Sequence, residues 1–263
     1  DGLGGGVSSL SKIVVVEPSE RPDVDVEYTF GQVSVGSPSV AYRTNCGNLT
    51  SAVGPFAIDE GFVLPERSDQ ATVRLFNVNT QKHIVSRFAL DGGCAAVEGD
   101  FELQGVAGLG APIRLEFQDP GGAVTGSLLP TGQASDVLDV PGFGDIRVSI
   151  VDATTAIVAV RAEDLGLVGV ELPEAIEANA DLLTRLELIR GSAAVRLGLS
   201  PSLAEATEIS PQSPLLVLAA LPQQAKTLAG TAIEADDVDL TARVMSMGQA
   251  HCALPLTAAM CLA

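Results

Sequence analysis

Apolar and polar residues alternate with a period of two along several short segments, and this pattern predicts β-strands in both halves of the chain. Ile13–Glu17 is instead a β-branched run ended by Pro18, so we expect a buried strand there. Gly31 interrupts the next segment and predicts a bulge. The predicted strands are Ile13–Glu17, Val24–Val35, Ala71–Asn77, His83–Ala89, Phe101–Val106, Ile113–Gln118, Ile146–Val151, Ala156–Val160, Leu215–Leu221 and Asp239–Met245.

Helical spacing of apolar residues occurs in three places. The first predicted helix follows the sequence NCGN and ends at Gly61, and Pro55 within it predicts a kink. Its residues are almost all apolar or small, so we expect it to be buried on most sides. The second helix is predicted over Glu174–Leu197, and the third is the terminal sequence LTAAMCLA. The apolar stripe of the second helix comprises Ile176, Leu182, Leu186 and Ile189.

The sequence DPGGAVTGSLLPTG, residues 119–132, is dense in turn-forming residues and predicts a boundary between two domains, 1–122 and 123–263. Each half contains strands, then a junction of polar and small residues, then an apolar helix. The junctions are residues 45–48 (NCGN) and 256–259 (LTAA). We therefore expect two like domains whose central helices begin near one another.

Acidic residues dominate the charge, with 33 Asp and Glu against 15 Lys and Arg and a net charge of −18. A nucleic-acid partner requires a basic surface, so this class of function is excluded. No run of about 18 uncharged apolar residues occurs, which argues against a membrane span. The N-terminal sequence lacks the layout of a secretion signal, and we expect a cytoplasmic protein.

Cysteine and histidine positions give no metal-ligand pattern. The four cysteines form no C-x-x-C pair, and the two histidines complete no cluster, so no metal is predicted. The glycines at positions 2, 4 and 5 precede a strand, whereas a dinucleotide fingerprint follows one. A loop that lets backbone approach a ligand fits these glycines better.

Lys12 is the first candidate for chemistry. It lies between the hydroxyl-rich sequence GGGVSSLS and the strand IVVVE. A lysine there can point into a cleft, lose solvation and acquire a lower pKa, which makes its amine a base near neutral pH. The alternative is a lysine at a strand edge that reaches solvent.

Cys46 is the second candidate, because it stands at the predicted N-terminus of the first helix. The helix dipole there favours the thiolate, and free N–H groups can hold an anion. Asn48 could cap this helix or donate to a carboxylate. The alternative is an inert, small apolar residue. Cys94, in the loop DGGCAAVEGD, lacks this helix-start context and is expected to be incidental, and Cys261 is expected to belong to the core. Neither histidine lies in a serine-hydrolase signature, although His251 precedes the second junction and could contact a ligand.

The run GLGGGVSSLSK, followed by QVSV, NCGNLTSAVGPFAIDEG and VRLFNVNT, resembles the methylaconitate isomerase (PrpF) family. The likeness continues in order through DPGGAVTGSLLPTG, VDA, DLGL, LELIR and ARVMSMGQAH, and covers essentially the whole chain. It implies a diaminopimelate-epimerase-like α+β fold: two similar domains, each a mostly antiparallel sheet wrapped around a central helix, with the site in the cleft between them.

The resemblance also implies an activity. Family members move a C=C bond by a proton shift, or change its geometry, in unsaturated di- and tricarboxylates such as methylaconitate and aconitate, as in propionate metabolism. The resemblance implies no cofactor. The expected partner is a small polycarboxylate substrate, and a homodimer is one possible oligomeric state. Carried over by position, the catalytic pair is Lys12 and Cys46, with either as the base. The substrate-binding residues are Ser9, Ser11, Asn45, Gly47, Asn48, Ser246, His251 and Thr257.

The chain departs from the family pattern in two respects. An N-terminal segment with an Arg-containing substrate loop and a C-terminal segment are expected to be absent, leaving both domains incomplete. Ala258 stands where the family has Gly, and would distort the site if its backbone needs a positive φ. Two rival functions follow: an epimerase with two thiols, disfavoured because Thr257 occupies the second thiol position, and an inactive relative that binds carboxylates or a protein.

Overall fold

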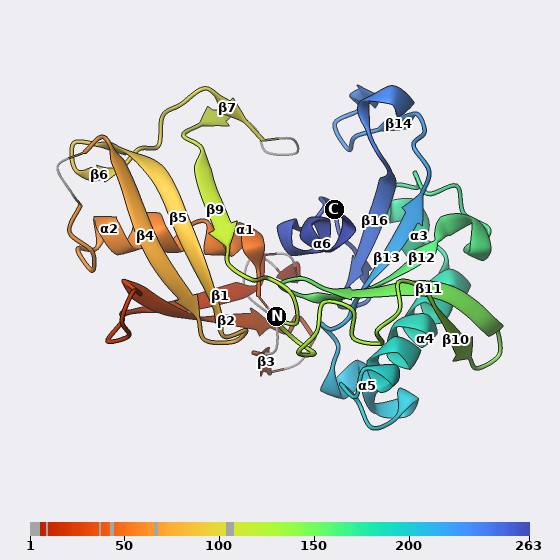
Figure 1. Ribbon diagram of the computed structural model, residues 1–263. Helices are drawn as coiled ribbons and strands as arrows, with labels where there is room; N and C mark the ends of the chain where they lie inside the picture. The colour runs from red at the N-terminus through yellow and green to blue at the C-terminus, as the bar shows by residue number, and fades with distance from the viewer. Residues whose placement is uncertain (1–5, 9, 37, 43–44, 66–67, 104–107) are drawn as a thin grey trace. The chain divides into compact units, whose positions relative to one another are not determined.

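The computed structural model describes residues 1–263 except 1–5, 9, 37, 43–44, 66–67 and 104–107. Contacts between residues divide the chain into two compact units, Asp1–Pro120 and Gly121–Ala263. Each unit is built on one large β-sheet with helices against it (Figure 1).

The first unit contains a seven-stranded sheet in the order β1-β2-β4-β5-β6, with β3 beside β2 and β9 beside β5. All described neighbours are antiparallel except β2 and β4, which are parallel. A small ribbon of β7 and β8 stands apart from this sheet. The strands are β1 (Lys12–Pro18), β2 (Val26–Val33), β3 (Val40–Ala41), β4 (Gln70–Asn77), β5 (Lys82–Asp91), β6 (Cys94–Ala95), β7 (Phe101–Glu102), β8 (Leu109–Gly110) and β9 (Ile113–Phe117).

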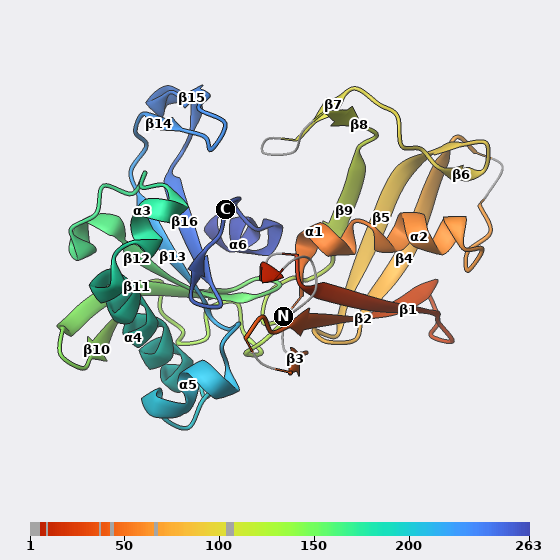
Figure 2. The same cartoon turned by 180° about the vertical axis from the view of Figure 1, so that it is seen from behind.

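One face of this sheet carries the two helices α1 (Gly47–Thr50) and α2 (Val53–Asp59), as Figure 2 shows. The single kinked helix expected here is thus two short ones. Pro55 has no N–H to donate to the carbonyl four residues before it, which explains the break. Gly54 allows α2 to approach the sheet, because a Cβ at this position would lie 2.6 Å from Ser86 Oγ. The core between helix and sheet includes Val53, Ala57, Ile58, Val26, Val73, Leu75 and Ile84.

The prediction that Ile13–Glu17 is a buried strand is wrong. β1 lies at the edge of the sheet, and Ile13 and Val15 are 44% and 59% exposed on the face without helices. The expected bulge at Gly31 is also absent, because β1 and β2 pair in unbroken register from Lys12↔Gln32 to Pro18↔Val26. Gly31 instead leaves room for neighbouring side chains, since a Cβ there would meet Val40 and Ile13 methyl groups at 2.8 and 2.9 Å.

The second unit contains a six-stranded sheet in the order β10-β11-β12-β13-β16-β17, in which only β12 and β13 are parallel. Its strands, with the small β14–β15 ribbon, are β10 (Asp136–Val140), β11 (Gly144–Asp152), β12 (Ala156–Arg161), β13 (Leu215–Ala220), β14 (Ala225–Lys226), β15 (Ala232–Ile233), β16 (Thr241–Ser246) and β17 (Gln249–Ala250). Its helices are η2 (Ala162–Leu165), α3 (Pro173–Glu177), α4 (Ala180–Arg196), α5 (Leu203–Ile209), η3 (Ala235–Asp237) and α6 (Leu256–Leu262).

Both faces of this second sheet are covered. One face packs against α4, with Ile150, Val158 and Leu216 in the core. Alternate residues of the same strands point to the opposite face, where Ile157 and Val217 meet Ala258 of α6. Burial on both sides explains why β12 and β13 are nearly continuous apolar runs.

The expected helix over Glu174–Leu197 is divided into α3 and α4 at Asn179. The Asn179 side chain caps α4 by accepting from the Leu182 N–H at 3.0 Å, which starts a new helix at this point. The predicted apolar stripe is confirmed, since its four members are all buried. The sequence did not predict α5 or β10.

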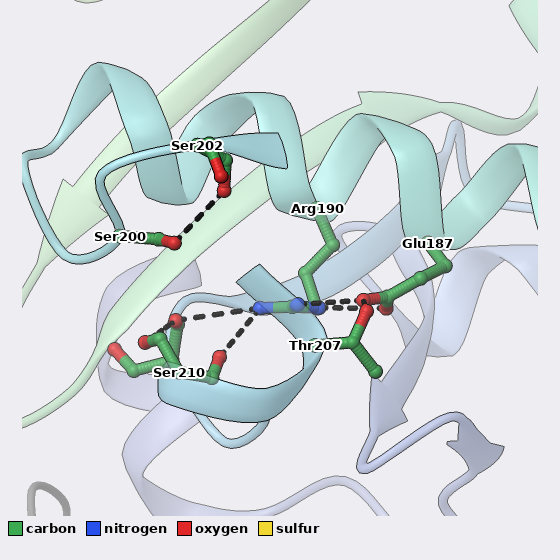
Figure 3. A network of polar contacts seen from close by, with 7 residues as sticks. Glu187, Arg190, Ser200, Ser202, Thr207 and Ser210 are labelled. Carbon is green, nitrogen blue, oxygen red and sulfur yellow. Dashed lines mark hydrogen bonds and ion pairs between the residues drawn. The ribbon is translucent and has the colours of Figure 1, made fainter. Parts of the chain in front are cut away.

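A buried arginine fixes α4 to the loop that precedes β13 (Figure 3). Arg190 is 4% exposed and donates to the Ser210 carbonyl at 2.7 Å. Its other nitrogens bind both carboxylate oxygens of Glu187, at 2.6 and 2.7 Å. Thr207 of α5 donates to the same carboxylate. The Arg190–Glu187 pair therefore joins three segments of the second unit, with α5 attached through the carboxylate.

The expected fold class is confirmed: each unit of this α+β protein is a mostly antiparallel sheet with helices packed against it. Two helices begin at the predicted junctions: α1 begins directly after Cys46, and α6 begins at Leu256.

Candidate active site

The side chains of Lys12 and Cys46 meet in the first unit. Lys12 Nζ donates a hydrogen bond to Cys46 Sγ over 3.2 Å, although the two residues are 34 positions apart in the sequence. Lys12 is the first residue of β1, and Cys46 is the residue that precedes α1. Both side chains are partly buried. An amine and a thiol at this distance can pass one proton between them.

The alternation of β1 explains why Lys12 points towards the helices. Val14 and Val16 pack on the core beneath α2, and Lys12 lies on the same face because it is an even-numbered residue of the strand. Ile13 and Val15 take the exposed face. The amine is thus directed towards Cys46 rather than to solvent at the strand edge.

A buried network of three side chains holds the segment that carries Cys46. The Tyr28 hydroxyl lies 2.9 Å from Thr50 Oγ1 and donates to Asn45 Oδ1 at 3.3 Å. Thr50 in turn hydrogen-bonds the Cys46 carbonyl at 2.9 Å. Burial raises the pKa of Tyr28 to about 12, so the phenol stays protonated. Asn45, expected to bind substrate, therefore also anchors the loop around Cys46.

Tyr28→Phe should lower the kcat of the proposed isomerisation about tenfold and leave KM nearly unchanged, because Cys46 loses a support rather than a contact with substrate. Kinetics on the purified variant would measure both. The chain has two tyrosines, and the exposed Tyr42 provides the matched control. A Tyr28→Phe enzyme with the kcat of Tyr42→Phe would show that the network has no positioning role.

The serine-rich loop before Lys12 is held by Gln32 of β2. The Gln32 amide donates to the carbonyls of Ser8 and Ser11 at 2.8 and 3.0 Å. Ser11 is fully buried, and its hydroxyl donates to the Val7 carbonyl. Ser9 lies outside the described residues. The position of Lys12 is therefore set by its own strand and by Gln32 opposite it.

Gly47 and Asn48 form the first turn of α1. Gly47 is buried, whereas Asn48 is exposed. The expectation that Asn48 caps the helix is wrong: Cys46 is the N-cap residue, and no side chain caps α1. The exposed Asn48 side chain fits the other expectation, a donor to a carboxylate.

Sequence reasoning missed Tyr28, Gln32 and Thr50. The period of two in β2 places Tyr28 and Gln32 on the core face with Val26. Because a buried tyrosine or glutamine requires a polar partner, this pattern could have indicated that β2 supports a polar site.

Comparison with known proteins identifies the family. The family model described as PrpF protein matches residues 1–263. The chain belongs to the PrpF family. It is 42% identical over 262 residues to 3-methylitaconate isomerase of Eubacterium barkeri, covering 99% of this chain and 68% of that protein. It is 38% identical over 269 residues to 2-methyl-aconitate isomerase of Shewanella oneidensis, covering 100% of this chain and 67% of that protein.

A solved structure agrees with the fold. The crystal structure of a methylitaconate-delta-isomerase superposes with a TM-score of 0.81 at 42% identity, covering 99% of this chain and 67% of that one. The two-sheet architecture described above is therefore that of an isomerase structure with clear sequence similarity.

Three further residues expected in a PrpF site lie in the second unit. Ser246 ends β16, and His251 follows β17, where its Nδ1 accepts from the Ala253 N–H at 3.2 Å. Thr257 is buried in the first turn of α6. Ala258 follows in helical conformation without a positive φ, so the distortion expected from its replacing Gly does not occur.

Cys261, also on α6, has the environment of a protonated thiol. Its Sγ lies 3.2–3.3 Å from the carbonyls of Thr155 and Ala153. Burial raises its pKa to about 11, and the negative charge of Asp152 contributes. A second thiol base, which the epimerase alternative requires, is therefore not provided by Cys261.

At pH 8, iodoacetamide should alkylate Cys94 and Cys252 much faster than Cys261. The reagent attacks the thiolate, and a thiol with a pKa of about 11 is ionised in roughly one molecule in a thousand at this pH. Cys94 and Cys252 are exposed, and Cys261 is partly buried. Peptide mapping after timed labelling measures the rates, and urea-unfolded protein is the control, since all four cysteines should then react alike. Equal rates in the folded protein would contradict the assignment.

The described residues contain no group of three or more His, Cys, Asp or Glu side chains arranged to hold a metal ion. They also form no helix with the length and apolar character needed to cross a membrane.

Proposed function

We propose that this chain is an isomerase that moves a C=C bond by proton transfer in a small, branched, unsaturated di- or tricarboxylate, without a cofactor. The observation that carries the proposal is the 3.2 Å contact of Lys12 Nζ with Cys46 Sγ. The names of the relatives support the substrate class, since they include methylitaconate, methylaconitate and oxalomesaconate isomerases.

The pair suits an allylic proton shift. One group removes a proton from the carbon next to the double bond, and the other returns a proton at the far end of the three-carbon system. We assign Lys12 as the base and Cys46 as the acid. After each turnover the proton taken up by Lys12 can return to Cys46 across the 3.2 Å contact. Because this restores both groups, the reaction needs no external redox or group-transfer reagent.

Substrate carboxylates require hydrogen-bond donors in a chain of net charge −18. Next to the pair, the backbone N–H groups of Gly47 and Asn48 open a helix, where N–H groups have no partner within the helix. The exposed Asn48 amide adds a donor. We assign Ser9, Ser11 and Asn45 to the same substrate-binding role, together with Ser246, His251 and Thr257 of the second unit.

We also propose a cytoplasmic location. All four cysteines are free thiols, and Cys94 and Cys252 are exposed. Exposed free thiols are typical of a reducing compartment, because thiols oxidise readily in an oxidising compartment.

The test is proton–deuterium exchange followed by NMR in D₂O. The protein is incubated separately with 3-methylitaconate, 2-methylaconitate, cis-aconitate and trans-aconitate. We expect at least one acid to incorporate deuterium at an allylic carbon and to give a second isomer. No exchange and no isomer with any of these acids would contradict the proposed function and favour a carboxylate-binding relative without activity.

A further inference from the structure

The contact between Lys12 and Cys46 has chemical consequences beyond proton transfer. A nucleophilic nitrogen lies 3.2 Å from a sulfur atom that is open to small oxidants, since Cys46 is only partly buried. Among the described residues, no other hydrogen bond to Cys46 Sγ occurs. The four cysteines are all free.

We propose that Lys12 and Cys46 form a peroxide-sensitive modification site, in which the oxidised thiol is captured by the amine as a sulfenamide. The product is a covalent S–N bond between Cys46 Sγ and Lys12 Nζ. Cysteine sulfenic acids condense readily with neighbouring nucleophiles, including thiols and amide nitrogens. At Cys46 the nucleophile in contact with sulfur is the side-chain amine of Lys12.

The reaction proceeds in two balanced steps. In the first, the Cys46 sulfur attacks hydrogen peroxide while the Lys12 amine takes the thiol proton: an S–O bond forms, the O–O bond breaks, and the departing hydroxide receives that proton from Lys12 and leaves as water. Sulfur is oxidised, peroxide is reduced, and the products are a sulfenic acid and a neutral amine. In the second, the amine attacks sulfur, an S–N bond forms, and the sulfenic hydroxyl leaves as water with an amine proton.

The structure favours capture over further oxidation. The second step is intramolecular, and a nucleophile held in contact has a high effective concentration. The Cys46 backbone is fixed by Thr50 and, through it, by Tyr28. The lysine stem is flexible, so the amine can close the remaining distance. Capture also protects the sulfur from irreversible oxidation to the sulfinic acid.

The bond would occupy both groups assigned to proton transfer and so stop isomerisation until a thiol reductant cleaves it. Two thiols restore the free amine and the free thiol and become a disulfide. This consequence rests on the proposed function, whereas the covalent bond itself does not.

The test is peptide mapping of the folded chain after treatment with hydrogen peroxide, without reductant. We expect a tryptic species that joins the Lys12 and Cys46 peptides, is uncleaved at Lys12, and has lost two hydrogens, about 2 Da. Dithiothreitol should return both free peptides. The triple variant Cys94→Ser, Cys252→Ser, Cys261→Ser should give the same species, which excludes a disulfide as the origin of the mass loss.

Lys12→Arg is the matched variant, since it keeps the positive charge but offers no nucleophilic amine. In this variant Cys46 should react with dimedone, a trap for sulfenic acids, whereas the wild-type Cys46 should be largely protected. Cys94 is exposed and should react with dimedone equally in both proteins. Equal labelling of Cys46 in the two proteins, or sulfinic acid without the joined peptide in the unsubstituted chain, would overturn the proposal.

Discussion

Lys12→Ala and Cys46→Ser should each lower the rate of isomerisation by roughly 10²–10⁴-fold, because each removes one of the two groups assigned to the proton shift. Steady-state kinetics on the acid that reacts in the exchange test would measure this loss. The double variant should be little slower than either single one, since two residues that act as a unit are not additive.

The two variants separate the roles of the pair. If Lys12 is the base, Lys12→Ala also abolishes deuterium exchange at the allylic carbon, whereas Cys46→Ser retains part of it. Cys94→Ser and Lys226→Ala are the controls, because both residues are exposed, and they should keep full activity. A rate within a few-fold of wild type in both Lys12→Ala and Cys46→Ser would contradict the assigned site.

Arg190→Met should destabilise the protein by about 3 kcal/mol, the lower end of the cost of breaking a buried ion pair. The substitution leaves the Ser210 carbonyl with only the longer bond from the Ser213 N–H, at 3.4 Å. It leaves Glu187 with Thr207 but without a cation, while an unbranched apolar side chain remains at position 190. Because the Glu187 side chain is 33% exposed, its carboxylate can be solvated in the variant, which reduces the loss of folding free energy. Urea unfolding followed by circular dichroism measures the change.

Arg161 supplies the comparison for Arg190. It also pairs with carboxylates, Glu163 and Asp164, at 2.8 and 2.7 Å, but its side chain is 60% exposed. Arg161→Met should therefore shift the unfolding midpoint much less than Arg190→Met, because exposed ion pairs contribute little to stability. Equal shifts would mean that burial does not determine the contribution of Arg190.

Local pattern predicted most of the sheet strands, and its failures have physical causes. The composition of β1 is that of a buried strand, yet burial depends on the strand's place in the sheet, and β1 lies at the edge. The helix predicted over residues 174–197 was divided by Asn179, whose capping role can be read from sequence only when a helix start is already suspected. β10 was missed because its apolar residues lie within a short acidic segment, DVLDV.

The site was predicted in part. Lys12 and Cys46 were singled out from their neighbours in the sequence and from the family resemblance, but the contact between them depends on the fold. The support from Tyr28 and Gln32 was not predicted, because both act across strands or loops distant in the sequence. Such contacts depend on register, which no single segment specifies.

The position of Lys12 at one end of an edge strand affects how the protein fluctuates. β1 has a described neighbour on one side only, namely β2. Strands with few buried contacts open by local unfolding at a lower free energy than the centre of a sheet. Opening of β1 would withdraw the amine from Cys46 while β2 and β4 stay folded. Amide hydrogens of β1 should thus exchange early, and a substrate held against Lys12 should slow this exchange, so ligand binding can be followed through the protection of this strand.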